Sequence, residues 1–161
     1  MKWITRARPK IDRIACPWLI QRFIDTEAEF LFAPPAEVRA EAQRLGAIPF
    51  DIEGVELSHV GPLCSLDALL TKYQLTDPAL GDIARIVRGA DTATLDLAPE
   101  ASGLLAISLG LSQLFSDDQE QLRHGMVMYD ALYAWRTRAF TERHTWNPQR
   151  DPAAGVPTGK A

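Results

Sequence analysis

Eight polar residues could carry chemistry, because they fall near expected turns or strand ends and not on the faces of amphipathic helices. They are Asp12, Arg13, Asp51, Glu56, His59, Cys64, Asp91 and Asp96. A histidine combined with several carboxylates suits a divalent metal such as Mn, Fe or Zn, and it needs no redox-sensitive thiolate. We predict that Asp12, His59 and Asp91 are metal ligands. Their spacing alone is weak evidence that they meet, so one shared site is a hypothesis.

Basic residues flank the first of these acids. Arg8, Lys10 and Arg13 lie on either side of Asp12, and we predict that they bind an oxyanion. If Arg13 faces the mouth of a sheet, its planar guanidinium group suits such a ligand. The whole chain is acidic, with a formal charge of −4 and a pI near 5.4. Because the chain is acidic, we expect no direct nucleic-acid binding. Because these basic residues lie close together in the sequence, we expect a small anion as the ligand.

Each candidate also has a purely structural interpretation. Asp12 could cap a helix, Asp91 could form a turn, and the other acids could be solvated turn or strand residues. Arg13 could form an exposed ion pair with Asp12, which contributes little to stability. Cys16 and Cys64 lie far apart and form no CxxC motif, so buried thiols are expected, and no zinc cage or disulfide. Thiol chemistry is the weakest option, because no vicinal cysteine could resolve an oxidised thiol.

A strand, a loop and a helix are expected to position Asp12. Residues 2–5 are rich in β-forming side chains, and apolar residues recur at helical spacing from Trp18 onward. The helix begins either at Asp12, acting as a cap, or at Cys16, with Pro17 in the first helical position. The sequence does not choose between these two starts.

Three more segments resemble strands. Residues 29–33 and 48–51 are short and apolar, and a predicted helix at residues 36–45 separates them. Residues 55–59 alternate between apolar and polar side chains as an edge strand would. This prediction places His59 at the end of a strand.

Two helices follow, and the second leads to Asp91. Ser65 is a plausible cap for the first of them. Asp77 and Pro78 form a cap followed by a first helical residue, and Gly89 is expected to end the helix that they start. Asp91 would then follow the helix directly.

The last two predicted helices are expected to cover the core. Pro99 opens the first of them, in which Leu104, Ile107, Leu111 and Leu114 share one face. We therefore predict that this helix is the most buried one. Ser116, Asp117 and Asp118 would cap the second helix.

This order of elements predicts a helix-rich α/β fold with a small, mainly parallel sheet covered by helices; an α+β fold is the alternative. We assign residues 1–145 to one domain and residues 146–161 to a mobile C-terminal tail. The sequence contains neither a secretory signal nor an apolar stretch long enough to cross a bilayer, so we expect a cytoplasmic location and no membrane partner. A homodimer is also considered.

Several segments together resemble the C-terminal domain of the ChrB chromate-resistance family. The most specific is residues 2–25 (KWITRARPKIDRIACPWLIQRFID). It is supported by ELSHVG at 56–61, CSLDALL at 64–70, IVRGAD at 86–91 and DLAPEASGL at 96–104. Pro62, Leu63 and Leu66 depart from the family pattern.

The resemblance implies a bacterial cytoplasmic protein that takes part in chromate resistance and the stress response. Longer family members carry an extra N-terminal region and have been described as chromate-responsive regulators; we do not carry a DNA-binding role over to this chain. The expected ligand is chromate or a phosphoester bound beside a divalent metal. Whether the protein is an enzyme stays open: metal-assisted hydrolysis is one option, and a non-enzymatic sensor or interaction module is the alternative.

Overall fold

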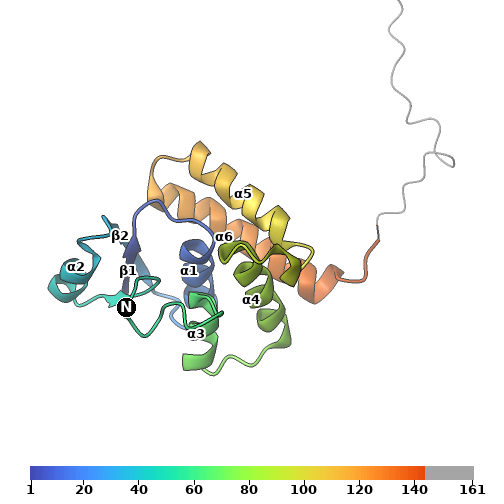
Figure 1. Cartoon of the computed structure of the whole chain (residues 1–161), viewed down its shortest axis with the longest axis horizontal. Helices are drawn as coiled ribbons and strands as arrows, with labels where there is room; N and C mark the ends of the chain where they lie inside the picture. Colours follow the sequence, from blue (N-terminus) through green and yellow to red (C-terminus); the bar gives the residue numbers. More distant parts are fainter. Residues whose placement is uncertain (144–161) are drawn as a thin grey trace, which may run out of the picture.

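The sheet has three parallel strands in the order β2-β1-β3. In the computed structural model, which describes residues 1–143, β1 spans Lys2–Arg6, β2 spans Glu29–Ala33 and β3 is limited to Ile48–Pro49. Parallel strands require crossovers, and a helix provides each one: α1 (Asp12–Phe23) leads to β2, and α2 (Val38–Leu45) leads to β3 (Figure 1). The predicted helix-rich α/β fold is confirmed, and the α+β alternative is excluded.

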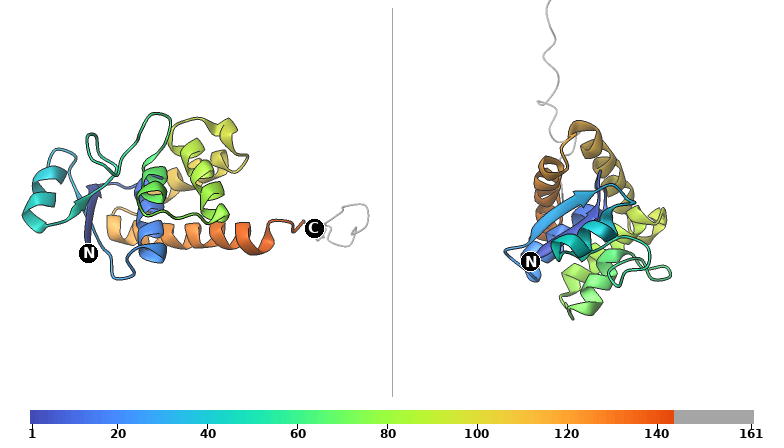
Figure 2. Two further views of the ribbon diagram at one scale, coloured as in Figure 1. Left: turned by 90° about the horizontal axis from the view of Figure 1, so that it is seen from below. Right: turned by 90° about the vertical axis from the view of Figure 1, so that its left-hand side faces the viewer.

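The two faces of the sheet carry different cores. Because side chains alternate along a strand, Trp3 faces the main core with α1, whereas Ile4 packs in a smaller cluster with α2. Figure 2 shows α2 on one side of the strands and the other helices on the opposite side. At the outer edge of β2, the side-chain amide of Gln119 donates a hydrogen bond to the carbonyl of Phe30, at 2.6 Å.

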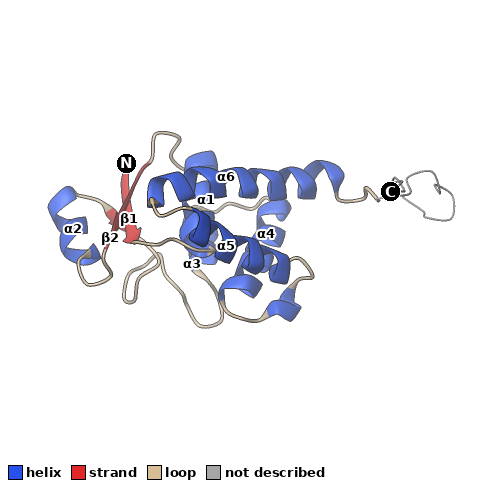
Figure 3. Ribbon diagram, turned by 90° about the horizontal axis from the view of Figure 1, so that it is seen from above, coloured by secondary structure: helices blue, strands red, loops and turns tan. Residues whose placement is uncertain are grey.

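Four helices follow the sheet in the chain, and all but the third of them pack against α1 (Figure 3). They are α3 (Ser65–Lys72), α4 (Pro78–Asp91), α5 (Ala101–Leu114) and α6 (Asp118–Ala134). A short 3-10 turn, η1 (Leu95–Leu97), precedes α5, and a π-helical turn, η2 (Trp135–Ala139), extends α6. No helix in this part of the chain is both long and apolar enough to cross a membrane.

Several local predictions are confirmed. The Asp77 carboxylate accepts a hydrogen bond from the N–H of Ala79 at 2.8 Å, with Pro78 as the first residue of α4. Asp117 caps α6 in the same way. Gly46 ends α2 with φ of 62°, a conformation that glycine adopts without strain.

Three boundaries differ from the predictions. α1 begins at Asp12, so Pro17 lies inside the helix and Cys16 does not start it. Residues 55–59 form an irregular loop in place of an edge strand. α4 continues through Gly89 to Asp91. Gly89 does not end the helix but allows α5 to approach α4 closely, since a Cβ at this position would lie 2.9 Å from the Cβ of Ala101.

The prediction that the helix after Pro99 is the most buried one is wrong. Ile107 and Leu114 of α5 are 54% and 76% exposed. The buried position against the sheet belongs to α1, in which every residue from Ile14 to Ile20 is buried, while α5 packs on α4 and α6 from outside. The predicted tail at residues 146–161 lies outside the described residues.

Candidate functional site

The three predicted metal ligands meet at one point. The Nε2 atom of His59 lies 3.1 Å from Oδ2 of Asp91 and 3.7 Å from Oδ2 of Asp12. One ligand atom from each of the three residues lies within 4.8 Å of the other two. Asp12 is the first residue of α1, Asp91 the last residue of α4, and His59 belongs to the loop before α3. The fold thus gathers residues that are far apart in the sequence.

Asp12 lies at the N-terminus of α3, where it is 1% exposed. Its carboxylate accepts hydrogen bonds from the N–H groups of Ser65 at 2.6 Å and Leu66 at 3.2 Å, and from the thiol of Cys16 at 3.4 Å. Burial raises the pKa of Asp12 to about 8, and the nearby Asp91 carboxylate adds to the shift. An ionised Asp12 is therefore costly unless a cation lies beside it.

Backbone strain accompanies the placement of Asp12. The preceding residue, Ile11, has φ of 41° and ψ of −99°, a region that is unfavourable for a β-branched side chain. Its carbonyl accepts hydrogen bonds from the N–H of Ala15 at 2.9 Å and from the hydroxyl of Tyr129 at 3.0 Å. Strain of this kind persists only where surrounding contacts hold it, and it is common at functional sites.

Asp51 adds a third carboxylate to the site. It is 4% exposed, and its φ of 50° again lies in the left-handed region. Oδ1 accepts a hydrogen bond from the Ser65 hydroxyl at 2.9 Å and lies 3.5 Å from Nε2 of His59. We named Asp51 as a candidate but not as a ligand. Its position after β3, like that of Asp12 after β1, is the signal that could have placed it at this edge of the sheet.

Two arginines surround Asp51. Nη2 of Arg6 lies 2.8 Å and Nε of Arg13 3.3 Å from Oδ2 of Asp51. Arg13 also donates a hydrogen bond to the carbonyl of Ala7 at 3.0 Å. Burial, with the nearby Arg6 second, lowers the pKa of Arg13.

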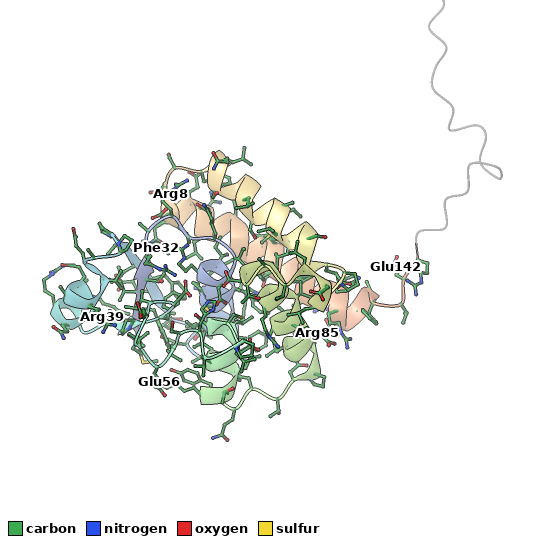
Figure 4. The ribbon with its side chains drawn as sticks, in the orientation of Figure 1. Arg8, Phe32, Arg39, Glu56, Arg85 and Glu142 are labelled. Atoms are coloured by element: carbon green, nitrogen blue, oxygen red, sulfur yellow. The ribbon has the colours of Figure 1, made fainter. Side chains whose placement is uncertain are left out.

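The other predicted anion-binding residues lie elsewhere. The Arg8 guanidinium donates hydrogen bonds to the carbonyls of Phe115 and Ser116, both at 2.9 Å, just beyond the C-terminal end of α5 (Figure 4). Lys10 makes no side-chain hydrogen bond or ion pair within residues 1–143. Of the three, only Arg13 belongs to the site, where Arg6, another member of the same N-terminal basic cluster, joins it.

The remaining candidates have structural surroundings. Glu56 is paired with Lys72 at the surface, and Asp96 is exposed in η1. Cys64 precedes α3 as its N-cap residue, and Cys16 is packed behind Asp12. Burial raises the pKa of both thiols, so the reactive thiolate is disfavoured.

A cavity of about 400 Å³ adjoins the site. Its walls include Arg6, Asp51, Ser58 and His59, together with the segment at residues 52–55. A small ligand in this cavity would contact His59 and Asp51 directly. Asp12 and Asp91 do not line the cavity, and Asp12 is almost fully buried, which suits residues that hold an ion more than residues that contact a substrate.

These features define a helix-rich α/β domain with a cluster of buried and partly buried acids beside one exposed histidine. Residues 3–136 match the family model of the C-terminal domain of ChrB. The chain therefore belongs to this family, which confirms the resemblance to the ChrB chromate-resistance proteins.

One curated relative is Protein ChrB of Cupriavidus metallidurans. It is 32% identical over 133 residues, which cover 82% of this chain and 40% of the relative. The chain thus spans less than half the length of that relative. No solved structure gives a significant match.

Proposed function

We propose that this domain binds a divalent metal ion through Asp12, His59 and Asp91, and a small oxyanion beside it. The observation that carries the proposal is the convergence of three ligand atoms within 4.8 Å of one another. Asp51 would supply a further oxygen, since its Oδ1 lies 3.5 Å from Nε2 of His59. Imidazole and carboxylate ligands favour Mn, Fe or Zn.

The charges of the buried groups support a cation. Burial, with the nearby Asp51 second, raises the pKa of Asp91, as burial does for Asp12. A metal ion stabilises buried carboxylates with raised pKa values, because it takes the place of the proton and of the water that burial removed. The N–H groups of Ser65 and Leu66 hold the Asp12 carboxylate in place. In this position Oδ2 of Asp12 lies 3.7 Å from Nε2 of His59.

The arginines support an anion next to the metal. When Asp12, Asp51 and Asp91 are all ionised, as metal binding requires, they outnumber the guanidinium groups of Arg6 and Arg13, and a divalent cation would make the net charge of the site positive. An oxyanion in the adjoining cavity would then meet a positive environment. Chromate and phosphoesters both fit this description. If a phosphoester is bound, the metal would polarise its oxygen and activate water.

Metal analysis of protein prepared without an affinity tag tests the cation site. We expect about one equivalent of Mn, Fe or Zn per chain, and its loss in His59→Ala and Asp91→Asn. The matched controls are His124→Ala on α6 and Asp96→Asn in η1, which should retain the metal. Metal that persists in His59→Ala, or that is absent from the wild type after reconstitution, would refute the proposal.

Titration of the metal-loaded protein tests the anion site. Calorimetry with chromate and with phosphate should show binding that weakens at least about tenfold in Arg6→Gln, because Arg6 lines the cavity and a charged hydrogen bond is worth about 1.5–3 kcal/mol. Turnover of a generic phosphoester would indicate an enzyme. Anion binding without turnover would favour a sensor.

A further inference from the structure

The cavity beside the metal site is larger than an inorganic oxyanion requires. Its volume is about 400 Å³. The four oxygens of such an anion take up roughly 120 Å³ if each has the volume of a water molecule, about 30 Å³. An anion held by Arg6 and the metal would therefore leave more than half of the cavity unfilled. A cavity of this size is typical of sites for organic ligands.

The segment at residues 52–55 forms one wall of the cavity and is anchored to α2. Ile52 and Val55 belong to the small apolar cluster that packs against this helix. The Arg39 guanidinium, on the same helix, donates a hydrogen bond to the carbonyl of Glu53 (Figure 4). The wall is therefore held by the fold and does not depend on a ligand for its shape.

Two polar side chains that line the cavity have no partner among the described residues. Ser58 is only 8% exposed, and its hydroxyl makes no hydrogen bond within residues 1–143. The Glu53 carboxylate is exposed and makes neither an ion pair nor a hydrogen bond in the same part of the chain. A nearly buried hydroxyl without a partner is costly. A ligand in the cavity would be in place to supply that partner.

We propose that the ligand of this cavity is a phosphomonoester of a polyhydroxy alcohol, such as a sugar phosphate. This inference rests on the proposed metal and oxyanion site and names the substrate class of that site. The phosphoryl group would lie beside the metal and Arg6, whose guanidinium group suits a phosphate. The hydroxylated carbon chain would lie along residues 52–55, within reach of Glu53 and Ser58.

Hydroxyl groups suit the side chains in this part of the cavity. A carboxylate such as Glu53 accepts hydrogen bonds from hydroxyls, as an acidic residue does with the ribose in dinucleotide-binding folds, and the Ser58 hydroxyl can both donate and accept. The volume left beside a phosphoryl group is roughly 280 Å³, or about nine water molecules, which fits a short carbon chain with its oxygens. The negative charge of Glu53 disfavours a second phosphoryl group there.

Calorimetry of the metal-loaded full chain tests the proposal. The probes are inorganic phosphate, two polyol esters (ribose 5-phosphate and glycerol 3-phosphate) and pentyl phosphate, which has an alkyl chain without hydroxyls. At least one polyol ester should bind about tenfold more tightly than both phosphate and pentyl phosphate, because it adds a hydrogen bond to a charged group. A phosphonate analogue replaces any ester that is turned over.

Substitution of Glu53 tests which part of the cavity provides the preference. Glu53→Ala should reduce the preference for the polyol ester over phosphate about tenfold. The side chain is exposed, so the thermal unfolding midpoint should stay the same. Glu27→Ala is the matched control, because Glu27 is exposed in the loop before β2 and does not line the cavity. This variant should keep the wild-type preference.

The outcomes separate this inference from the proposed function. Phosphate binding without a gain for either polyol ester would overturn the inference and leave the metal and oxyanion site standing, and so would a gain that persists in Glu53→Ala. A larger gain for ethanolamine phosphate, lost in Glu53→Ala, would show that the ligand is an amino alcohol ester and overturn the polyol. If protein that holds its metal binds no anion, the oxyanion part of the proposed function fails together with this inference.

Discussion

The N-termini of α3 and α4 both receive an aspartate, but from very different places. Asp77 directly precedes α4 and accepts a hydrogen bond two residues on. Asp12 reaches α3 from 53 residues earlier in the chain, although α3 already has a local cap in Asp67, which accepts a hydrogen bond from the N–H of Cys64 at 3.0 Å. The local cap serves Cys64, and Asp12 serves the N–H groups of Ser65 and Leu66, so both aspartates cap a helix. Unlike Asp77, however, Asp12 is buried and lies beside His59 and Asp91, which indicates a role beyond capping.

The largest expected difference between the two acids is in their pH dependence. The pKa of Asp12 is about 8 when folded, against 3.8 as its ordinary value. Between these values the folded chain holds a proton that the unfolded chain has released, so the stability of the metal-free protein should fall as pH rises from about 4 to 8, by up to about 1.4 kcal/mol per pH unit. Urea unfolding at several pH values should show this slope in the wild type and a much smaller one in Asp12→Asn. Equal slopes in the two proteins would show that Asp12 titrates normally.

Asp12→Ala should have the next largest effect. It leaves the N–H groups of Ser65 and Leu66 without their acceptor in a buried place, and each such loss costs about 1–3 kcal/mol. Relief of the buried carboxylate offsets part of this cost. This relief is small at pH 4, close to the ordinary pKa of the group, so we expect a net loss of about 2–4 kcal/mol in the free energy of unfolding at that pH, and complete loss of metal binding by calorimetry at neutral pH. Asp12→Asn retains an acceptor and should lose metal binding with a smaller loss of stability.

Asp77→Ala should have the smallest effect and should leave metal binding unchanged. It removes the cap of α4 and the acceptor of the Tyr133 hydroxyl, which lies 2.7 Å away. A cap of this kind is worth about 1 kcal/mol, and the second hydrogen bond adds a similar amount. Urea unfolding measures the loss of stability, and metal titration measures binding. A weakened metal site in Asp77→Ala would remove the distinction between the two acids.

Local chemistry explains what could be predicted from the sequence. Asp77 with Pro78, and Gly46 after α2, act within one turn of the chain, so their residue types are sufficient. The grouping of Asp12, His59 and Asp91 followed from their residue types near predicted element ends.

The partners of individual side chains could not be predicted, because they depend on the tertiary arrangement. Arg8 and Arg13 have the same side chain and similar positions in the sequence, yet one reaches the end of α5 and the other Asp51. The apolar pattern of α5 indicates burial but not which surface covers it. Gly89 has the residue type of a helix end, but its role is the close contact between α4 and α5.

The hydrogen bond from Gln119 to Phe30 bears on how the protein behaves at high concentration. β2 is an outer strand with the sequence Glu-Phe-Leu-Phe-Ala, and an apolar strand with a free edge is a template for pairing with other chains. Gln119, in the first turn of α6, occupies one of the carbonyl groups on that edge. Fraying of the start of α6 would expose this strand, so the Asp117 cap protects the chain against aggregation as well as holding the helix in place.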